Sequence, residues 1–180
     1  MKKKVRWITE TAVLLALLIA VQGLTAGLGN QFVTGSCVNL ILAVAAALAG
    51  LWSGAAIAVL SPFLASLLGI GPKFVQLLPA VALGNLVYAL FWYAAAGRST
   101  RTLLAQTAYW LGAAAAKFLT LYLLMTRLLV PALVRGGTVP EKAAQVLKLQ
   151  FSWPQLITAL IGGALALAVL PALRRALHRT

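Results

Sequence analysis

The sequence is nearly devoid of acidic and metal-binding side chains. It contains no Asp, two Glu (Glu10 and Glu141), one His (His178) and one Cys (Cys37) among 180 residues. A carboxylate pair, a metal-ligand cluster, an internal disulfide and a His-activated serine within a span are therefore excluded. A glycine-rich phosphate loop ending in Lys and Ser or Thr is also missing, so the chain cannot hydrolyse ATP by itself. We predict that it is not an enzyme and that it carries no metal and no cofactor.

Apolar residues dominate what remains. They make up 62% of the chain, against 9% charged residues, and the mean hydropathy is +0.97. Stretches such as 43–49 and 164–170 are apolar on every side, unlike the alternating strands of a membrane barrel. A helix that crosses the hydrocarbon layer takes about 20 residues, so roughly six crossings use most of the chain. The prediction is an all-α integral membrane protein, a single domain (1–180) built as a bundle of six transmembrane helices.

Glycines, prolines and polar runs indicate where the spans end. The expected helices cover roughly 7–24, 36–49, 52–68, 77–96, 103–134 and 154–170. Pro62 is expected to bend the third helix, and Pro131 to mark the last turn of the fifth or a kink in it. Between the last two spans, 141–149 is predicted to form a short amphipathic helix on the membrane surface.

The net charge of +13 is distributed between the spans. Nine basic residues lie in three groups: Lys2, Lys3, Lys4 and Arg6; Arg98 and Arg101; Arg174, Arg175 and Arg179. If both termini face the cytoplasm, all three groups do so, as the positive-inside rule requires. The opposite side then carries four: Lys73, Arg135, Lys142 and Lys148. This placement predicts a multi-pass protein of the inner (plasma) membrane with cytoplasmic termini, in contact with lipid and not with nucleic acid.

The most unusual residue is Lys117, near the middle of the fifth predicted span. An ammonium at that depth costs about 3 kcal/mol or more unless it finds water, an anion or a carbonyl. At 100° per residue it shares one side of the helix with a polar stripe: Gln106, Ala113, Thr120, Leu124 and Arg127. Because no internal carboxylate is placed to neutralise it, Lys117 either binds an anionic ligand or serves as a structural residue that hydrogen-bonds carbonyls or reaches an interface.

Other polar side chains in the spans admit the same two interpretations. Asn85, Tyr88 and Trp92 share a face of the fourth helix, and Gln155 and Thr158 begin the last one. Amide and aromatic groups together are typical of ligand pockets, although they also link helices in bilayers. Asn39, in the second helix, is interpreted as such a link.

Small residues form a ridge on the first helix. Ala12, Ala16 and Ala20 recur every four residues, which would let another helix approach closely. Since alanine is abundant here, spacing alone makes this a weak signal.

Several stretches together carry a resemblance to a known family. They are TAVLLALLIA (11–20), LWSG (51–54), LSPF (60–63), LGIGP (68–72), ALGN (82–85) and FSWPQLITALIGG (151–163). With its length and its six predicted spans, the chain resembles the S components of energy-coupling factor (ECF) transporters, the vitamin and micronutrient importers of prokaryotes.

The resemblance implies the substrate-binding membrane subunit of an ABC-type importer. Its substrate pocket would lie near the outer face under three loops, which here contain Gln31, Thr34, Lys73, Gln76 and Arg135. An alanine motif on the first helix, matched by Ala12, Ala16 and Ala20, would dock onto a transmembrane coupling subunit that carries two ATPases. The resemblance names no substrate. We predict a pocket formed by Lys117, Asn85, Tyr88, Trp92, Thr120, Arg127, Gln155 and Thr158.

The composition also bears on two other classes of membrane protein. A non-catalytic assembly or structural protein of the cell envelope would also be basic, poor in acidic residues and six-helical. A stand-alone ion-coupled carrier usually keeps an intramembrane Asp or Glu, which this sequence does not show.

Overall fold

The computed structural model describes residues 2–97 and 102–177, and in this part of the chain the regular structure is entirely helical. The elements are α1 (Lys2–Ala26), α2 (Gln31–Leu48), α3 (Leu51–Leu67), the short 3-10 helix η1 (Val75–Leu77), α4 (Leu78–Gly97), α5 (Leu103–Leu121), the π-helical segment η2 (Tyr122–Leu129), α6 (Val130–Arg135), α7 (Glu141–Gln150) and α8 (Trp153–Leu177). The expected all-α fold is confirmed for these residues.

Most of these helices are long and apolar enough to cross a membrane. Five candidate spans are found in the described residues: Lys4–Ala26, Gln31–Leu48, Val75–Ala96, Leu104–Arg135 and Glu141–Leu177. α3 is apolar but has only 17 residues. The predicted number of six crossings therefore depends on α3 and stays a prediction.

Three helix ends differ by five residues or more from those expected from the sequence, and the first is the start of α1, which lies at Lys2 and not at residue 7. α2 begins at Gln31 and not at residue 36, because the Asn30 side chain accepts a hydrogen bond from the Phe32 N–H and caps the helix there. α8 continues to Leu177, past the expected end at 170, and passes through Pro171. Arg174 and Arg175 lie in its last turn, where positive charge suits the carbonyl end of a helix.

The fifth predicted span is a continuous helical rod with a π-helical stretch in it. α5, η2 and α6 follow one another from Leu103 to Arg135, and the Val130 N–H donates to the Met125 carbonyl, five residues back. Pro131 comes directly afterwards, and a proline ring would clash with the carbonyl four residues before it in a regular α-helix. The wider π turn gives that ring room and changes the angular position of every residue after Leu121.

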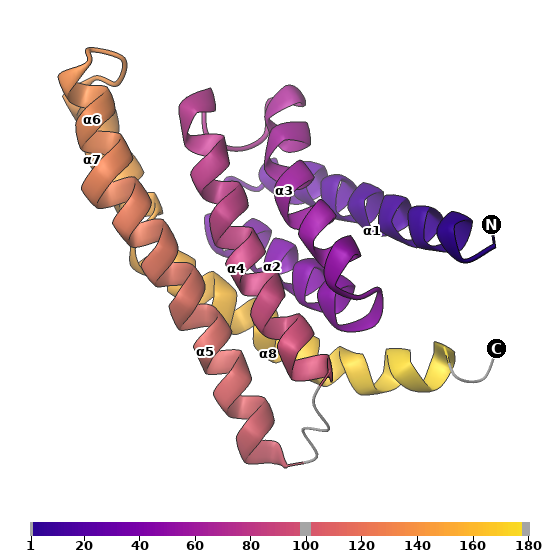
Figure 1. The fold of residues 1–180 in the computed structure, drawn as a ribbon. Coiled ribbons are helices and arrows are strands. Elements are labelled where there is room, and N and C mark those ends of the chain that lie inside the picture. Colours follow the sequence, from indigo (N-terminus) through magenta and orange to yellow (C-terminus); the bar gives the residue numbers. More distant parts are fainter. Residues whose placement is uncertain (1, 98–101, 178–180) are drawn as a thin grey trace.

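α2 lies at the centre of the bundle and packs against α1, α3, α4 and α8, while α5 packs against α4 and α8. Leu18, Leu42, Ile57, Tyr88 and Ala159 are among the buried residues of this main core. A second, smaller core lies where η1, η2, α6 and α7 meet. Figure 1 shows α6 and α7 side by side at one end of the molecule, away from the start of α1 and the end of α8.

The helices alternate between two ends of the bundle. The start of α1, the turn between α2 and α3, and the end of α8 lie toward one end, and the α1–α2 turn and the α3–α4 connection lie toward the other (Figure 1). Both described ends of the chain are therefore on the same side of the bundle.

Gly162 allows α8 to lie directly against α2. A Cβ added there would be 2.5 Å from the Asn39 Cβ and 2.6 Å from the Ser36 carbonyl oxygen. Helices in membranes associate chiefly through such close contacts between small residues. The distance between Asn39 and α8 can thus be short only because residue 162 is a glycine, which has no Cβ.

Gly162→Ala should lower the melting temperature of the detergent-solubilised protein, because α8 must move away from α2. Overpacking of this kind costs about 1 to 3 kcal/mol. The measurement is a thermal melt followed by tryptophan fluorescence. Gly27→Ala is the control, since a Cβ there would meet nothing within 4 Å. Equal melting temperatures for the two variants would show that the α2–α8 contact does not limit stability.

Candidate functional site

Lys117 is at the centre of a buried polar network. Its side chain is only 3% exposed, and Nζ donates hydrogen bonds to Asn39 Oδ1 at 2.6 Å and to Asn85 Oδ1 at 2.8 Å. Nζ also lies 5.4 Å from the centre of the Tyr88 ring, within the range of a cation–π interaction. One ammonium therefore joins α5 to α2 and α4.

The network continues into α8. Tyr88 donates to the Ala159 carbonyl at 3.1 Å, and the Asn39 amide donates to Thr158 Oγ1 at 3.4 Å. Thr158 donates in turn to the Gln155 carbonyl at 3.1 Å. The residues that hold Lys117 are thus themselves held by α8, which restricts where Nζ can lie.

No carboxylate of the described residues neutralises this ammonium. The ion pair found in the described ranges joins Arg6 to Glu10 at 2.7 Å, near the start of α1. An ammonium has three N–H donors, and the described side chains accept two from Lys117, both through neutral amide oxygens. The positive charge is solvated by dipoles, which leaves it able to attract an anion.

Lys117 also lines a cavity of about 390 Å³. The cavity lies among the α1–α2 turn, α3, the α3–α4 connection, and the junction of α7 with α8. Its polar lining consists of Gln22, Asn30, Gln31, Thr34, Asn39, Ser61, Asn85, Lys117, Gln150 and Gln155. Both its volume and its mixture of apolar walls with a few polar groups are typical of a small-molecule site.

The structure brings five of the eight predicted site residues to this region. Lys117, Asn85 and Gln155 line the cavity, and Tyr88 and Thr158 are buried behind it in the network. Among the residues of the predicted capping loops, Gln31 and Thr34 line the cavity, whereas Lys73, Gln76 and Arg135 do not.

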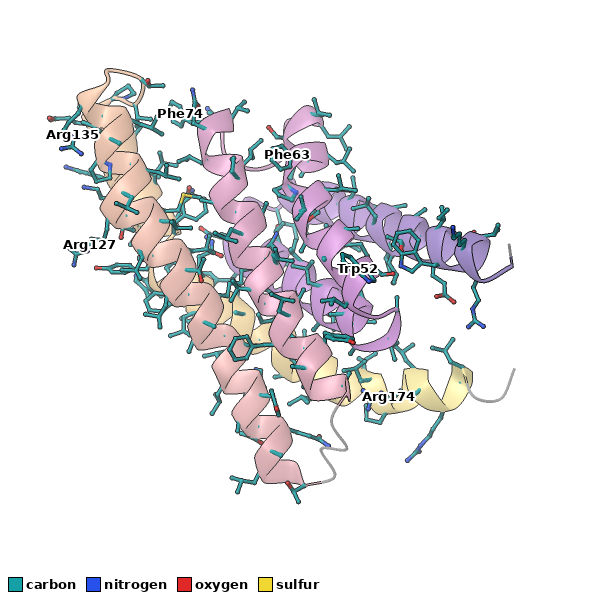
Figure 2. All side chains as sticks on the ribbon, in the orientation of Figure 1. Trp52, Phe63, Phe74, Arg127, Arg135 and Arg174 are labelled. Carbon is teal, nitrogen blue, oxygen red and sulfur yellow. The ribbon has the colours of Figure 1, made fainter. Side chains whose placement is uncertain are left out.

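The other three predicted residues lie elsewhere. Trp92 lines a separate hollow of about 70 Å³ together with Arg174, and Thr120 donates to the Ala116 carbonyl of its own helix. Arg127 is exposed, donates to the Tyr122 hydroxyl at 3.2 Å and points away from the bundle (Figure 2). The π-helical turn explains why Arg127 does not share the face of Lys117, because the angle of 100° per residue used in the prediction does not apply beyond Leu121.

Sequence reasoning missed Gln22 and Ser61, which line the cavity from α1 and α3. It interpreted Asn39 as a link between helices, whereas Asn39 both links helices and lines the cavity. A usable signal was present for Gln22, because it is an amide near the end of an otherwise apolar run.

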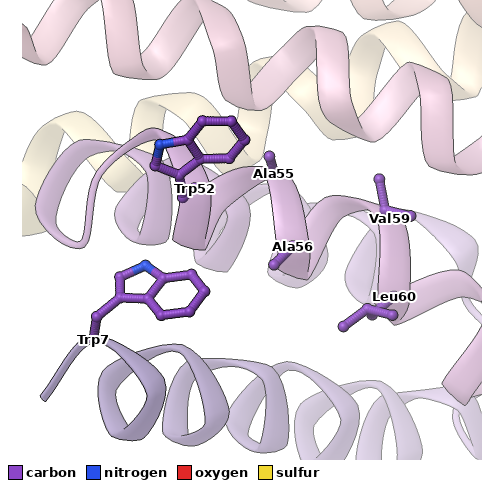
Figure 3. A pocket seen from close by; sticks show the side chains of 6 residues that line it. All are labelled: Trp7, Trp52, Ala55, Ala56, Val59 and Leu60. Atoms are coloured by element: carbon purple, nitrogen blue, oxygen red, sulfur yellow. The ribbon is translucent and has the colours of Figure 1, made fainter. Parts of the chain in front are cut away.

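The alanine ridge lies on the free side of α1. Ala12, Ala16 and Ala20 are exposed, whereas Thr11 and Leu18 face the bundle and are buried. A hollow of about 660 Å³ lies between the start of α1 and α3 and is lined by Trp7, Trp52, Ala55, Ala56, Val59 and Leu60 (Figure 3). It has no charged lining residue and so does not suit an anion.

The fold is thus a helical bundle whose long apolar helices are able to cross a membrane, with a cavity beside the buried Lys117. The comparison with protein families is more specific. The family model described as "ECF transporter, substrate-specific component" matches residues 6–174. The chain therefore belongs to this family, whose members are multi-pass membrane subunits that work with an ECF module of coupling and ATPase subunits. Neither the search of curated proteins nor the search of solved structures returned a match.

The bond between Lys117 and Asn85 can be tested with a double-mutant cycle. Lys117→Met and Asn85→Leu should each destabilise the protein, because each strands a buried polar partner. The free energy of unfolding of the double variant should fall by less than the sum of the two single losses, with a coupling energy of about 1 kcal/mol or more. The measurement is reversible unfolding in mixed micelles. The control cycle combines Lys117→Met with Gln145→Leu, at an exposed position on α7, and its losses of unfolding free energy should be additive. If the losses are additive in both cycles, the hydrogen bond between Lys117 and Asn85 does not contribute to stability.

Proposed function

We propose that this protein is the substrate-binding S component of an ECF importer and that it binds a small anionic micronutrient, such as a vitamin, in the Lys117 cavity. The observation that carries the proposal is the position of Lys117. It is a buried ammonium with neutral hydrogen-bond partners and no described carboxylate beside it, at the wall of a cavity of about 390 Å³.

The physical case rests on charge. A buried ammonium is destabilising unless it is paired and hydrogen-bonded. Asn39 and Asn85 supply two acceptors and hold Nζ in place, and a bound carboxylate or phosphate would supply a further acceptor together with the opposite charge. Because Nζ is already positioned, little ordering remains to be done when the anion binds.

The first prediction concerns the charge of Lys117. Lys117→Met keeps the side-chain length and removes the ammonium, so it should weaken ligand binding at least tenfold, which corresponds to about 1.4 kcal/mol. The small molecule retained by the purified protein is first identified by mass spectrometry and is then titrated into the wild type and the variant.

Arg127→Met is the matched control, since it removes an exposed cation of the same rod outside the cavity. It should bind as the wild type does. If a folded Lys117→Met protein retains normal affinity, Lys117 is a structural link between helices and the anionic-ligand proposal is wrong.

The import partners follow from the family and from α1. We propose that a transmembrane coupling subunit and two ATPases energise transport. Ala12, Ala16 and Ala20 are proposed as the docking face, because they are exposed on the side of α1 that does not pack against the bundle. A row of methyl groups there lets a partner helix approach closely.

Ala16→Trp should abolish assembly with the coupling subunit, because an indole cannot fit where two helices touch, while ligand binding stays intact. The measurement is co-purification of the complex after co-expression of all subunits. Leu119→Trp is the control, since Leu119 is also exposed but lies on α5. A normal complex yield from Ala16→Trp would assign the docking face elsewhere. Capture of cell-wall or cytoskeletal proteins in place of ATPases would favour an assembly protein.

We also propose that both termini face the cytoplasm of the cell whose inner membrane holds the protein. The start of α1 and the end of α8 lie at one end of the bundle (Figure 1), and the described basic residues Lys4, Arg6, Arg174 and Arg175 lie at these two helix ends. Arg98, Arg101 and Arg179, which the sequence analysis assigns to the same side, lie outside the described residues. In this orientation the cavity opens toward the outside, as an importer requires.

A further inference from the structure

Two further polar side chains line the cavity, those of Gln22 of α1 and Ser61 of α3, and together they are called its second polar region. α1 and α3 pack against each other, whereas α5, which carries Lys117, packs against α4 and α8. The two polar regions therefore belong to different helix pairs that border the same cavity.

Gln22 and Ser61 each have a buried polar atom without a hydrogen-bond partner among the described residues. This holds for the Gln22 amide oxygen and for the Ser61 hydroxyl, and Ser61 as a residue is 1% exposed. A buried polar atom left unpaired costs about 1 to 3 kcal/mol. Ser36 is also unpaired, but it does not line the cavity.

The Ser61 hydroxyl differs from several threonine hydroxyls of this protein, which are paired within their own helix. Hydroxyls in helices commonly donate to the carbonyl four residues back. Thr11, Thr25, Thr120 and Thr126 all do so here. Ser61 does not, so its hydroxyl remains free to bond a group in the cavity.

The two regions differ in what they can bind. A lysine ammonium only donates hydrogen bonds, whereas an amide oxygen only accepts them and a serine hydroxyl can do either. The lining also includes apolar side chains, among them those of Val38, Ala65, Ile70 and Val81. A molecule that satisfies the whole cavity has an anionic group, an apolar body and an N–H or O–H donor.

We propose that the ligand of this protein is such an acid and that an amide or heterocyclic N–H, or a hydroxyl, of the ligand donates to Gln22 Oε1 and Ser61 Oγ while its anionic group binds Lys117. The inference rests on the proposed function and narrows its substrate class. It excludes simple fatty acids and other acids that have no second polar group.

The test uses two matched pairs of acids as probes. Indole-3-propionate is compared with 1-methylindole-3-propionate, and 4-acetamidobutyrate with its N-methyl analogue. Binding is measured by thermal stabilisation and by isothermal titration on the full-length protein in detergent. Within each pair that binds, the N–H acid should bind at least tenfold more tightly than the N-methyl acid.

Gln22→Leu distinguishes a hydrogen bond from a steric effect of the added methyl group. Leucine is shorter than glutamine by one methylene group and has no hydrogen-bond acceptor, so it adds no bulk to the cavity and the preference for the N–H acid should fall to less than threefold. Ser61→Ala should reduce it in the same direction. Gln76→Leu, at an exposed position that does not line the cavity, should leave it unchanged.

Two kinds of result would contradict the proposal, one against the role of Gln22 and Ser61 and one against the anionic site at Lys117. If both members of every pair bind equally well to the wild type, or if the preference persists in Gln22→Leu, the second polar region is wrong while the Lys117 proposal stands. If the methyl esters of the acids bind as tightly as the acids, or if none of the four acids binds, the anionic site is wrong and this inference is wrong with it.

Discussion

The structure depends on how one ammonium is kept inside a membrane bundle. Lys117 is placed by two amide oxygens and an aromatic ring, and not by a counter-charge. The free-energy cost of burying an isolated charge in a medium of low polarity is prohibitive. The neighbours of Lys117 must therefore turn the negative ends of their dipoles toward the ammonium. This requirement explains why polar side chains on α2, α4 and α8 converge at the same depth.

Close packing of helices makes that convergence possible. Gly162 lets α8 touch α2 at Asn39, and Gly35 stands against Thr158, where an added Cβ would be 2.9 Å from Thr158 Cγ2. At larger helix separations, the Asn39 amide would not reach Thr158 and would be free to turn away from Lys117. The glycines therefore serve the site indirectly, since they fix the distances over which the polar groups interact.

α1 carries two surfaces with different uses. Gln22 lines the cavity near the end of the helix, whereas Ala12, Ala16 and Ala20 are exposed at earlier positions. Among the described residues, α1 packs chiefly against α2 and α3, and its exposed side is available for a partner. The same helix can thus border the ligand site and present a docking face, as the proposed role in an importer requires.

The sequence by itself determined the helical class, the approximate spans and the exceptional position of Lys117. These follow from local properties, because apolar run length and the energetic penalty of a buried charge do not depend on which helices are neighbours. It also supplied the family through the stretches at 11–20 and 151–163.

The tertiary structure decided which polar residues meet. Arg127 and Trp92 appeared on suitable helix faces, yet a π-helical turn carries Arg127 away and Trp92 lies by another hollow. Gln22 gave a usable signal and Ser61 almost none, but the importance of both comes from α1 and α3 bringing unpaired groups to a cavity that Lys117 also lines. Such a meeting depends on packing between segments far apart in the chain, and no local pattern encodes it.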